Sequence, residues 1–250
     1  MMERPIAIVT GGSRGIGAAT VRMLASRGYD VAFTFRRDND AAALVLSDVE
    51  KVERRALAIK ADCGDEMAII DLFHEVDADL GPVSLLVSNA ANTGPSSRIE
   101  EVSYETLRMV TDLNILGPIL LAKEAIKRMS TLHGGQGGNI VNVSSITSYL
   151  GSPADYVWYA ASKGAVNSFT HGLALEVAKE GIRVNAVSPG PTDTLIHEEW
   201  GRHDRLRNLP ASIPMGRIAR PEEIASAICW IASEEASFVT GQVLPVSGGK

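Results

Sequence analysis

Tyr159 and Lys163 are the two side chains of this sequence whose types and spacing best suit proton transfer. On a helix, residues four apart lie on one face, about one turn from each other. A free tyrosine has a pKa of about 10, and a neighbouring ammonium favours the phenolate and lowers that value toward neutral pH. The spacing also occurs on ordinary helix surfaces. Tyr156 is a rival for the same role, although Ala160 stands where its lysine would be.

A glycine-rich stretch, Thr10-Gly11-Gly12-Ser13-Arg14-Gly15-Ile16-Gly17, is the second feature that could do chemistry. It follows an apolar run and precedes a helical pattern. Glycines there allow a tight turn and let the backbone approach a pyrophosphate. The N-terminus of the next helix adds N–H groups and a positive dipole end. We therefore predict a pyrophosphate-binding turn, with these cofactor-binding residues: Gly11, Ser13, Arg14, Gly15, Ile16 and Gly17.

Short apolar runs alternate with helical patterns along the chain. The predicted strands are Ile6–Thr10, Val31–Phe35, Ala56–Ala61, Val83–Ser88, Asn139–Val143, Arg183–Ser188 and Gln242–Val246. Several are apolar throughout, which is typical of strands buried on both faces of a parallel sheet. Helices are expected between them, among them Ile16–Arg27, Glu66–Asp79, Pro118–Thr131 and Tyr156–Glu180. The β-α-β-α order predicts an α/β fold: a doubly wound, Rossmann-type parallel seven-stranded sheet with helices on both faces.

This order of elements brings the two chemical features together. Tyr159 and Lys163 open the helix after the fifth strand, and Ser144-Ser145 closes that strand. A serine hydroxyl in this place can donate a hydrogen bond to a substrate oxygen as charge develops on it. The polar stretch 195–213, which follows the sixth strand, is where an open α/β sheet would carry a substrate lid. A solvated surface helix is the alternative reading of that stretch.

The motifs together resemble the short-chain dehydrogenase/reductase family. They are the TGxxxGxG turn, Asn114 in Asp112-Leu113-Asn114, the serine, YxxxK, and Pro189-Gly190-Pro191-Thr192-Asp193-Thr194. The resemblance implies four catalytic residues: Asn114, Ser145, Tyr159 and Lys163. The family's serine lies about 13 residues before its tyrosine, whereas Ser145 and Ser144 lie 14 and 15 before Tyr159. We favour Ser145 and accept a one-residue insertion; Ser144 stays open.

The resemblance also assigns residues after the other strands to the cofactor. It implies that Asp62 meets the adenine ring and that Lys163 holds the nicotinamide ribose. Ser88-Asn89-Ala90-Ala91 departs at both ends from the family's Asn-Asn-Ala-Gly, so only the two middle residues are carried over. The further predicted cofactor-binding residues are Asn89, Ala90, Tyr159, Pro189, Gly190, Thr192 and Thr194.

Basic residues indicate which nicotinamide cofactor is bound. NAD sites usually place a carboxylate at the end of the second strand, where it would repel a 2′-phosphate. Here that strand ends in Arg36-Arg37, and Arg14 lies in the glycine turn. Guanidinium groups around one phosphate form a bidentate clamp. We predict NADP, with NAD possible if Arg36 and Arg37 are only solvated loop charges.

Length and composition limit the possible partners, metals and location of the protein. The 250 residues suit a single NAD(P)-binding catalytic domain, 1–250. A net charge of −6 disfavours nucleic acid as a partner. Cys63 and Cys229 belong to no metal-ligand cluster, so no metal is expected and both are expected to be reduced. No apolar run reaches the roughly 18 residues that span a bilayer, and nothing resembles a signal peptide. A cytoplasmic protein without a membrane partner is expected.

These observations predict an oxidoreductase that transfers a hydride between NADP(H) and a carbonyl or secondary alcohol. Alternatives are an NAD-using sugar or alcohol dehydrogenase, a 3-oxoacyl-carrier-protein reductase, and a nucleotide sensor without catalysis. Glu180 stands where the acyl-carrier reductases usually carry a basic residue, which counts against that role. The resemblance lies closest to uncharacterised bacterial oxidoreductases near the glucose 1-dehydrogenases. It implies a homotetramer that pairs helices 106–131 and 156–180.

Overall fold

The computed structural model describes residues 4–194 and 209–250. Within them, seven parallel strands form one sheet in the order β3-β2-β1-β4-β5-β6-β7. Their bounds are β1 (Ile6–Val9), β2 (Asp30–Phe35), β3 (Ala56–Lys60), β4 (Leu85–Ser88), β5 (Gly138–Val143), β6 (Ile182–Pro189) and β7 (Val243–Val246). The predicted doubly wound parallel sheet is confirmed, and each predicted strand is present to within a few residues.

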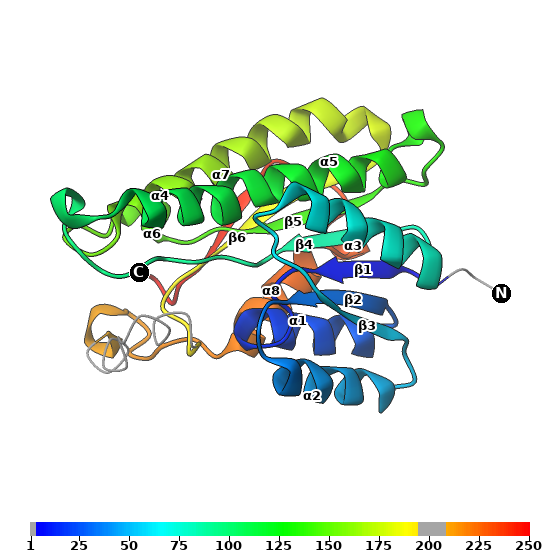
Figure 1. The fold of residues 1–250 in the computed structure, drawn as a ribbon, viewed down its shortest axis with the longest axis horizontal. Coiled ribbons are helices and arrows are strands. Elements are labelled where there is room, and N and C mark those ends of the chain that lie inside the picture. The colour runs from blue at the N-terminus through cyan, green and yellow to red at the C-terminus, as the bar shows by residue number, and fades with distance from the viewer. Residues whose placement is uncertain (1–3, 195–208) are drawn as a thin grey trace.

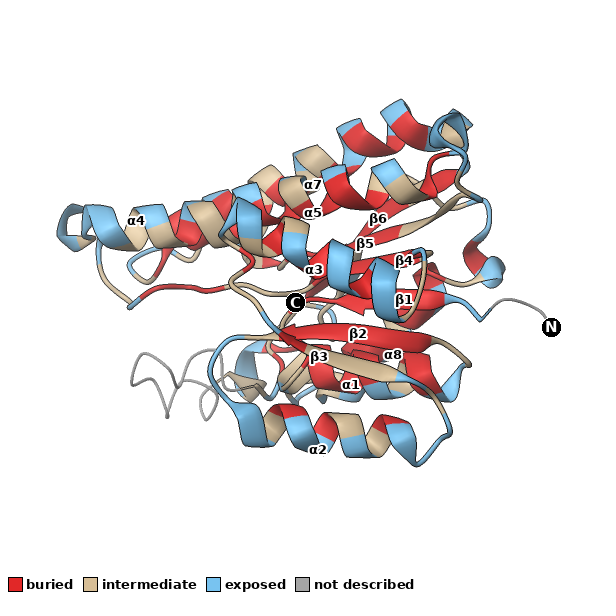
Figure 2. Ribbon diagram, turned by 45° about the vertical axis from the view of Figure 1, so that its right-hand side comes forward, coloured by how far each residue is buried: buried red, intermediate tan, exposed pale blue. Residues whose placement is uncertain are grey.

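The central strands are buried on both faces, as their uninterrupted apolar runs predict (Figure 2). In β1, Ile6 and Ile8 pack into one core, while Ala7 and Val9 pack into the other. Successive side chains of a strand point to opposite faces, so a strand between two helical layers needs apolar residues at every position. This is why the sequence shows continuous runs where a half-exposed sheet would show alternation.

Helices cover both faces of the sheet (Figure 1). One layer holds α3 (Glu66–Asp79), α5 (Gly117–Met129) and α7 (Val157–Val177); the other holds α1 (Gly15–Ser26), α2 (Asn39–Glu50) and α8 (Pro221–Ile231). The predicted bounds of α3 match those observed. α7 ends three residues earlier than predicted, because Ala178–Glu180 tightens into a 3₁₀ turn before Gly181, whose φ is +77°.

The helical stretch predicted at 106–131 is divided into three parts. α4 (Tyr104–Thr111) runs into a π-helical segment, Asp112–Leu116, and then into α5. A π-helical turn holds an extra residue and often marks a functional position. The short helix α6 (Thr147–Leu150) follows β5 and was not among the predicted helices.

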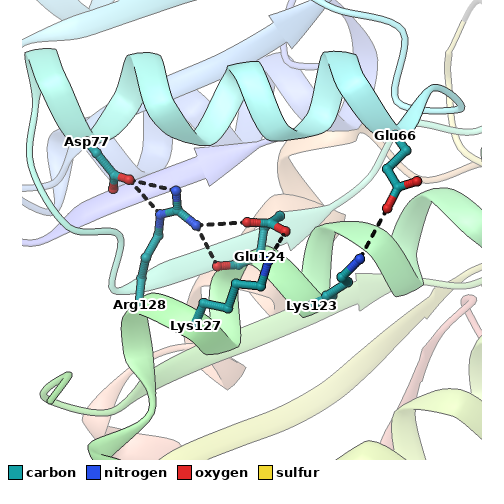
Figure 3. A network of polar contacts seen from close by, with 6 residues as sticks. All are labelled: Glu66, Asp77, Lys123, Glu124, Lys127 and Arg128. Atoms are coloured by element: carbon teal, nitrogen blue, oxygen red, sulfur yellow. Dashed lines mark hydrogen bonds and ion pairs between the residues drawn. The ribbon is translucent and has the colours of Figure 1, made fainter. Parts of the chain in front are cut away.

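A charged network joins α3 to α5 at the outer surface (Figure 3). The Arg128 guanidinium lies 4.8 Å from the centre of the Phe73 ring and 2.7 Å from the Asp77 carboxylate. Burial raises the pKa of the Glu124 carboxyl, but hydrogen bonds from Lys127 and Arg128 outweigh it, so that pKa lies below its ordinary value. The network fixes two helices whose inner faces support the sheet.

Both cysteines are buried and unpaired, as predicted. Burial raises the pKa of the Cys63 and Cys229 thiols to about 11. Both groups are therefore protonated and unreactive near neutral pH.

The lid predicted at 195–213 falls mostly outside the described residues. Its last residues form a 3₁₀ turn, Pro210–Ser212, followed by the buried Ile213. In the part of the chain that is described, no helix is both long and apolar enough to cross a membrane.

Candidate active site

A cleft of about 970 Å³ lies at the carboxyl ends of the strands. β1 is flanked by β2 on one side and β4 on the other, so the order of the strands reverses beside it. Open α/β sheets bind ligands at such a switch point. Each of the first six strands contributes to the cleft through the residues that follow it, and these include Gly11, Arg36, Asp62, Asn89, Ser144 and Gly190.

The glycine turn after β1 is shaped by close backbone contacts. Gly11 and Gly15 have φ values of +65° and +53°, which side chains rarely adopt. A Cβ on Gly17 would lie 2.1 Å from the Gly11 carbonyl oxygen. Gly17 therefore holds the turn from behind, and it is not among the residues that line the cleft. The other predicted residues of the turn, Gly11, Ser13, Arg14, Gly15 and Ile16, do line it.

The N-terminus of α1 faces the same turn. The helix begins at Gly15, and its N-cap residue Arg14 has extended backbone without a side-chain cap hydrogen bond. The first N–H groups of a helix have no intrahelical partner and carry the positive end of its dipole. This end of the cleft can therefore hold a phosphate.

Two threonines join the turn to the neighbouring strands. The Thr10 hydroxyl accepts hydrogen bonds from the backbone N–H groups of Asn89 (2.9 Å) and Ala90 (3.0 Å). The Thr34 hydroxyl accepts one from the Gly11 N–H at 3.0 Å. The Asn89 amide in turn donates to the Thr10 carbonyl at 2.9 Å. Sequence reasoning missed Thr34, whose signal was a polar residue inside an otherwise apolar strand.

The three arginines that the sequence assigns to the cofactor, Arg14, Arg36 and Arg37, all line the cleft. The Arg36 guanidinium forms an ion pair of 3.2 Å with Asp62, and both side chains are about half exposed. The other Asp62 oxygen accepts a hydrogen bond from the Gly64 N–H. Asp38, the first carboxylate after β2, caps α2 through the Ala41 N–H. Asp38 also lines the cleft, but one of its carboxylate oxygens is bonded at the start of α2.

Tyr159 and Lys163 lie side by side on the first turns of α7, and both line the cleft. The Lys163 ammonium is 5.7 Å from the centre of the Tyr159 ring. It donates a hydrogen bond of 2.8 Å to the Val143 carbonyl at the end of β5. Burial lowers the pKa of Lys163 to about 8. The pair is therefore a buried one, unlike the surface pair that the spacing alone would allow.

The two serines after β5 have different surroundings. The Ser144 hydroxyl is buried and donates to the Asn167 side chain at 2.6 Å. The Ser145 hydroxyl is only partly buried and accepts hydrogen bonds from the backbone N–H and the hydroxyl of Thr147. Its own proton is then the one that can be donated to a substrate. The geometry favours Ser145 over Ser144.

Asn114 lies in the π-helical segment and is fully buried. Its amide oxygen accepts from the Asn92 N–H, and its amide nitrogen donates to the Asn92 carbonyl and to the Ser162 hydroxyl. Ser162 donates in turn to the Tyr159 carbonyl at 2.7 Å. Asn114 thus connects Asn92 to α7, the helix that carries Tyr159. Asn92 lines the cleft and was missed by sequence reasoning.

Tyr156, the rival tyrosine, also lines the cleft. Its ring meets that of Tyr159 edge-on, with centroids 5.5 Å apart and an interplanar angle of 85°. Position alone therefore does not exclude it. What distinguishes Tyr159 is the ammonium of Lys163 on the next turn.

The end of β6 and the segment after it line the cleft and reach the glycine turn. Its predicted cofactor residues, Pro189, Gly190, Thr192 and Thr194, all line the cavity. The Thr192 hydroxyl donates to the Gly190 carbonyl at 2.9 Å. A Cβ on Gly15 would meet the Thr194 methyl at 3.2 Å, so Thr194 lies directly against the turn. Across residues 4–194 and 209–250, no group of three or more His, Cys, Asp and Glu is placed to hold a metal.

Comparisons with known proteins agree with this arrangement. A family model described as enoyl-(acyl carrier protein) reductase matches residues 11–250. The uncharacterised oxidoreductase YgfF of Escherichia coli is 44% identical over 245 residues, which cover 98% of this chain and 99% of that protein.

Two solved structures share the fold over nearly the whole chain. A blue fluorescent protein from a metagenomic library, in complex with NADPH, has a TM-score of 0.90 at 34% identity, covering 98% of this chain and 97% of that one. A short-chain dehydrogenase from Burkholderia cenocepacia, in complex with NADP, has a TM-score of 0.90 at 30% identity, covering 99% and 97%. The chain therefore belongs to the short-chain dehydrogenase/reductase family and is an oxidoreductase of that family.

Proposed function

We propose that this protein is an NADP-dependent carbonyl reductase or secondary-alcohol dehydrogenase in which Tyr159 is the general acid or base. The observation that carries the proposal is the buried pair of Tyr159 and Lys163 in a cleft that also contains the glycine turn. The reaction class follows from a proton-transfer group and a dinucleotide site that open into one cavity.

The residues present fit a nicotinamide dinucleotide. Gly11 and Gly15 adopt the positive φ values that shape the turn, and a turn without side chains at these positions lets a phosphate approach its backbone. The unpaired N–H groups at the start of α1 add the positive end of the helix. When bound, the nicotinamide supplies or accepts the hydride. Asp62, Asn89, Ala90 and the segment from Pro189 to Thr194 would hold the rest of the cofactor.

NADP is preferred over NAD because of charge. Arg14, Arg36 and Arg37 line the adenosine end, and two or three guanidiniums suit the 2′-phosphate. The NADPH and NADP complexes among similar structures support this preference. One observation favours the alternative of an NAD-using sugar or alcohol dehydrogenase. Asp62 pairs with Arg36, so part of the positive charge that would bind a 2′-phosphate is already neutralised.

The protein's own groups would divide the proton chemistry among them. In carbonyl reduction, Tyr159 gives its phenolic proton to the oxygen that gains negative charge. Ser145 donates a hydrogen bond to the same oxygen and steadies that charge. The Lys163 ammonium stabilises the phenolate that Tyr159 becomes when it has given up its proton. Asn114 bonds Asn92, which follows β4, to Ser162 on α7. These bonds hold the substrate side of the cleft at a fixed position relative to Tyr159.

Two other roles have less support. In the position where acyl-carrier reductases usually carry a basic residue, Glu180 accepts a hydrogen bond from Ser130 and is part of the packing between α5 and α7. With the net charge of −6, this disfavours docking of an acidic carrier. A sensor without catalysis would not need Tyr159 and Lys163 to be paired and buried.

Assembly and location complete the proposal. We expect a homotetramer, because α5 and α7 present large apolar side chains to the surface, among them Ile119 and Leu175. Light scattering of the purified protein would give its mass in solution. The two unpaired thiols suit a reducing compartment, so the cytoplasm is the expected location.

The test is a parallel titration with NADPH and NADH, followed by a screen of ketones and aldehydes for oxidation of the bound cofactor at 340 nm. The proposal predicts tighter binding of NADPH and NADPH-dependent reduction of at least one carbonyl compound. Equal affinity for the two dinucleotides, or tighter binding of NADH, would mean that the three arginines do not select the 2′-phosphate. Binding of neither dinucleotide would contradict the function as a whole.

A further inference from the structure

The substrate half of the cleft has two walls that come from distant parts of the sequence. One wall includes Asn92, which lines the cleft and is backed by residues 93–97. The whole stretch 92–97, which follows β4, is called here the wall segment. The other is the start of α7, which carries Tyr159. The wall segment has no regular secondary structure. Its position therefore depends on the bonds that join it to its neighbours.

Trp158, the residue before Tyr159, makes one of these bonds. Its indole N–H donates to the Thr93 carbonyl at 2.8 Å, and its side chain is almost fully buried. The ring packs in a small apolar cluster with Val110, Tyr156 and Tyr159. A tryptophan nitrogen is only a donor, so this bond satisfies both groups in a place without water access. The bond joins the residue before Tyr159 directly to the wall segment.

The residues on either side of the Thr93 carbonyl are tightly constrained. Gly94 has a φ of +70°, and a Cβ there would lie 2.6 Å from the Thr106 methyl. The Gly94 N–H donates to the Asn92 side chain at 2.8 Å. The backbone of Asn92 is held on both sides by the Asn114 amide. Thr93, between these fixed residues, has its carbonyl aimed at Trp158.

A second attachment lies further along the same walls. The Ser96 hydroxyl donates to the Asp155 carboxylate at 2.6 Å, and the Ser97 N–H donates to the Asp155 carbonyl at 2.9 Å. The loop that leads to Asp155 is strained, because Ser152 and Ala154 have φ values of +46° and +55°. Such conformations persist where the surrounding contacts hold them, often beside functional sites. Both walls are thus tied together on either side of Tyr156.

We propose that Trp158 is a positioning residue, whose indole N–H holds the wall segment at a fixed distance from Tyr159 and so sets the geometry of the substrate half. Without this bond, the Thr93 carbonyl is left unpaired and the wall segment moves away from the helix. The carbon and oxygen that react would then be held less accurately against Tyr159. The cofactor half is joined to β1 through Thr10 and does not depend on Trp158. The catalytic part of the inference rests on the function proposed above; the structural part does not.

The experiment compares Trp158→Phe with Trp230→Phe, a matched change on α8, which lies outside the cleft lining. Hydrogen exchange is measured by mass spectrometry on peptides that cover 92–97, whose N–H groups at Asn92, Gly94 and Ser97 are bonded in the native wall. A buried neutral hydrogen bond changes an opening equilibrium roughly fivefold to tenfold. We expect exchange at 92–97 to be faster by about that factor in Trp158→Phe and unchanged in Trp230→Phe.

Turnover is measured in the same variants with the carbonyl compound that the wild type reduces best with NADPH. We expect kcat/KM per NADPH-binding site to fall about 10- to 100-fold in Trp158→Phe, since small misplacements near reacting atoms cost that much. The NADPH Kd should stay within about twofold, because the cofactor half is untouched. If the Phe variant does not fold, 3-benzothienylalanine at position 158 keeps the shape of the indole and removes only the N–H.

Each outcome decides the inference. Faster exchange with lower kcat/KM supports it. Unchanged exchange at 92–97 overturns the attachment, and faster exchange with unchanged kcat/KM overturns the positioning role. A wild type that reduces no carbonyl compound would contradict the proposed function and the catalytic part together, while the exchange measurement would still decide whether Trp158 holds the wall.

Discussion

The proposed cofactor half and the proposed substrate half of the cleft are built in different ways. The cofactor half follows β1, β2 and β4, and its turns are fixed by backbone sterics and by Thr10 and Thr34. The proposed substrate half joins the start of α7 to a wall segment without regular structure, and side chains from distant segments, such as Asn114 and Trp158, hold the two together. Its shape can therefore change without altering the sheet. Such a construction suits a fold that can carry different substrate sites beside one cofactor site.

The two halves should respond differently to mutation. In the cofactor half, an added methyl group collides with backbone, which cannot move without disrupting the sheet edge. In the substrate half, a lost side chain removes one or two hydrogen bonds and loosens a wall. The first kind of change should abolish binding, and the second should lower turnover while binding persists.

Gly17→Ala should have the largest effect. Its Cβ would lie 2.1 Å from the Gly11 carbonyl oxygen, a distance that real contacts do not show. We expect the NADPH affinity to fall more than about 100-fold and the free energy of unfolding to drop by about 3 kcal/mol or more. Calorimetric titration and urea unfolding measure both. Gly164→Ala on α7 is the matched control, because a Cβ there meets nothing within 4 Å. Wild-type NADPH binding in Gly17→Ala would mean that the turn is not the phosphate site.

Asn114→Ala tests the substrate half. It leaves the buried N–H and carbonyl of Asn92 without their partners, and one unsatisfied buried group costs about 1–3 kcal/mol. We expect a loss of about 2–3 kcal/mol in the free energy of unfolding and a much lower kcat, with NADPH affinity nearly kept. Asn89→Ala is the counterpart in the cofactor half and should weaken NADPH binding instead. If both variants lost the same property, the two halves would not be separable.

Arg36→Asp sharpens the account of cofactor choice. A guanidinium bonded to a phosphate contributes about 1.5–3 kcal/mol, or roughly 10- to 100-fold in affinity. We expect NADPH affinity to fall by that factor while NADH affinity changes little, as measured by parallel titrations. Arg22→Asp on α1 is the control, because Arg22 pairs with Asp48 away from the cleft. Equal losses for both dinucleotides would show that Arg36 does not read the phosphate.

The smallest predicted effect concerns the pH dependence of stability. Burial lowers the pKa of Lys163 to about 8 in the folded protein, below the 10.5 of an ordinary lysine. Between these values the unfolded chain binds a proton that the folded chain does not, so the free energy of unfolding rises with pH. Compared with Lys163→Met, the wild type should gain about 1.4 kcal/mol from pH 7 to pH 9. Urea unfolding at both pH values measures this, and parallel curves would mean that the ammonium is not destabilised by burial.

The predicted residues of the turns after β1 to β4, apart from Gly17, line the cleft, and there is a physical reason why the sequence could place them there. They lie in short turns directly after apolar strands, and local patterns suffice to place such turns. Gly17 was predicted to bind the cofactor, but it packs against the Gly11 carbonyl behind the turn and does not line the cleft. Thr34 was missed because one polar residue in an apolar strand does not by itself indicate a bond to the glycine turn.

The substrate half could not be predicted in the same way. The bond between Trp158 and Thr93 joins residues 65 apart in the sequence, and no periodicity signals it. The choice between Ser144 and Ser145 depends on which hydroxyl Asn167 binds, which only the packing of α7 decides. The π-helical segment at Asn114 likewise has no clear pattern in the sequence.

The most direct test of the central claim is to compare Tyr159→Phe with Tyr156→Phe. Both tyrosines line the cleft and contact each other edge-on, so the two variants differ mainly in which hydroxyl is lost. The turnover of an NADPH-dependent carbonyl reduction and the NADPH Kd are measured for both. We expect Tyr159→Phe to lower kcat about 100- to 10,000-fold with NADPH binding kept, and Tyr156→Phe to retain most turnover. Near-normal turnover in Tyr159→Phe, or its loss in Tyr156→Phe alone, would contradict the assignment of Tyr159 as the proton-transfer residue.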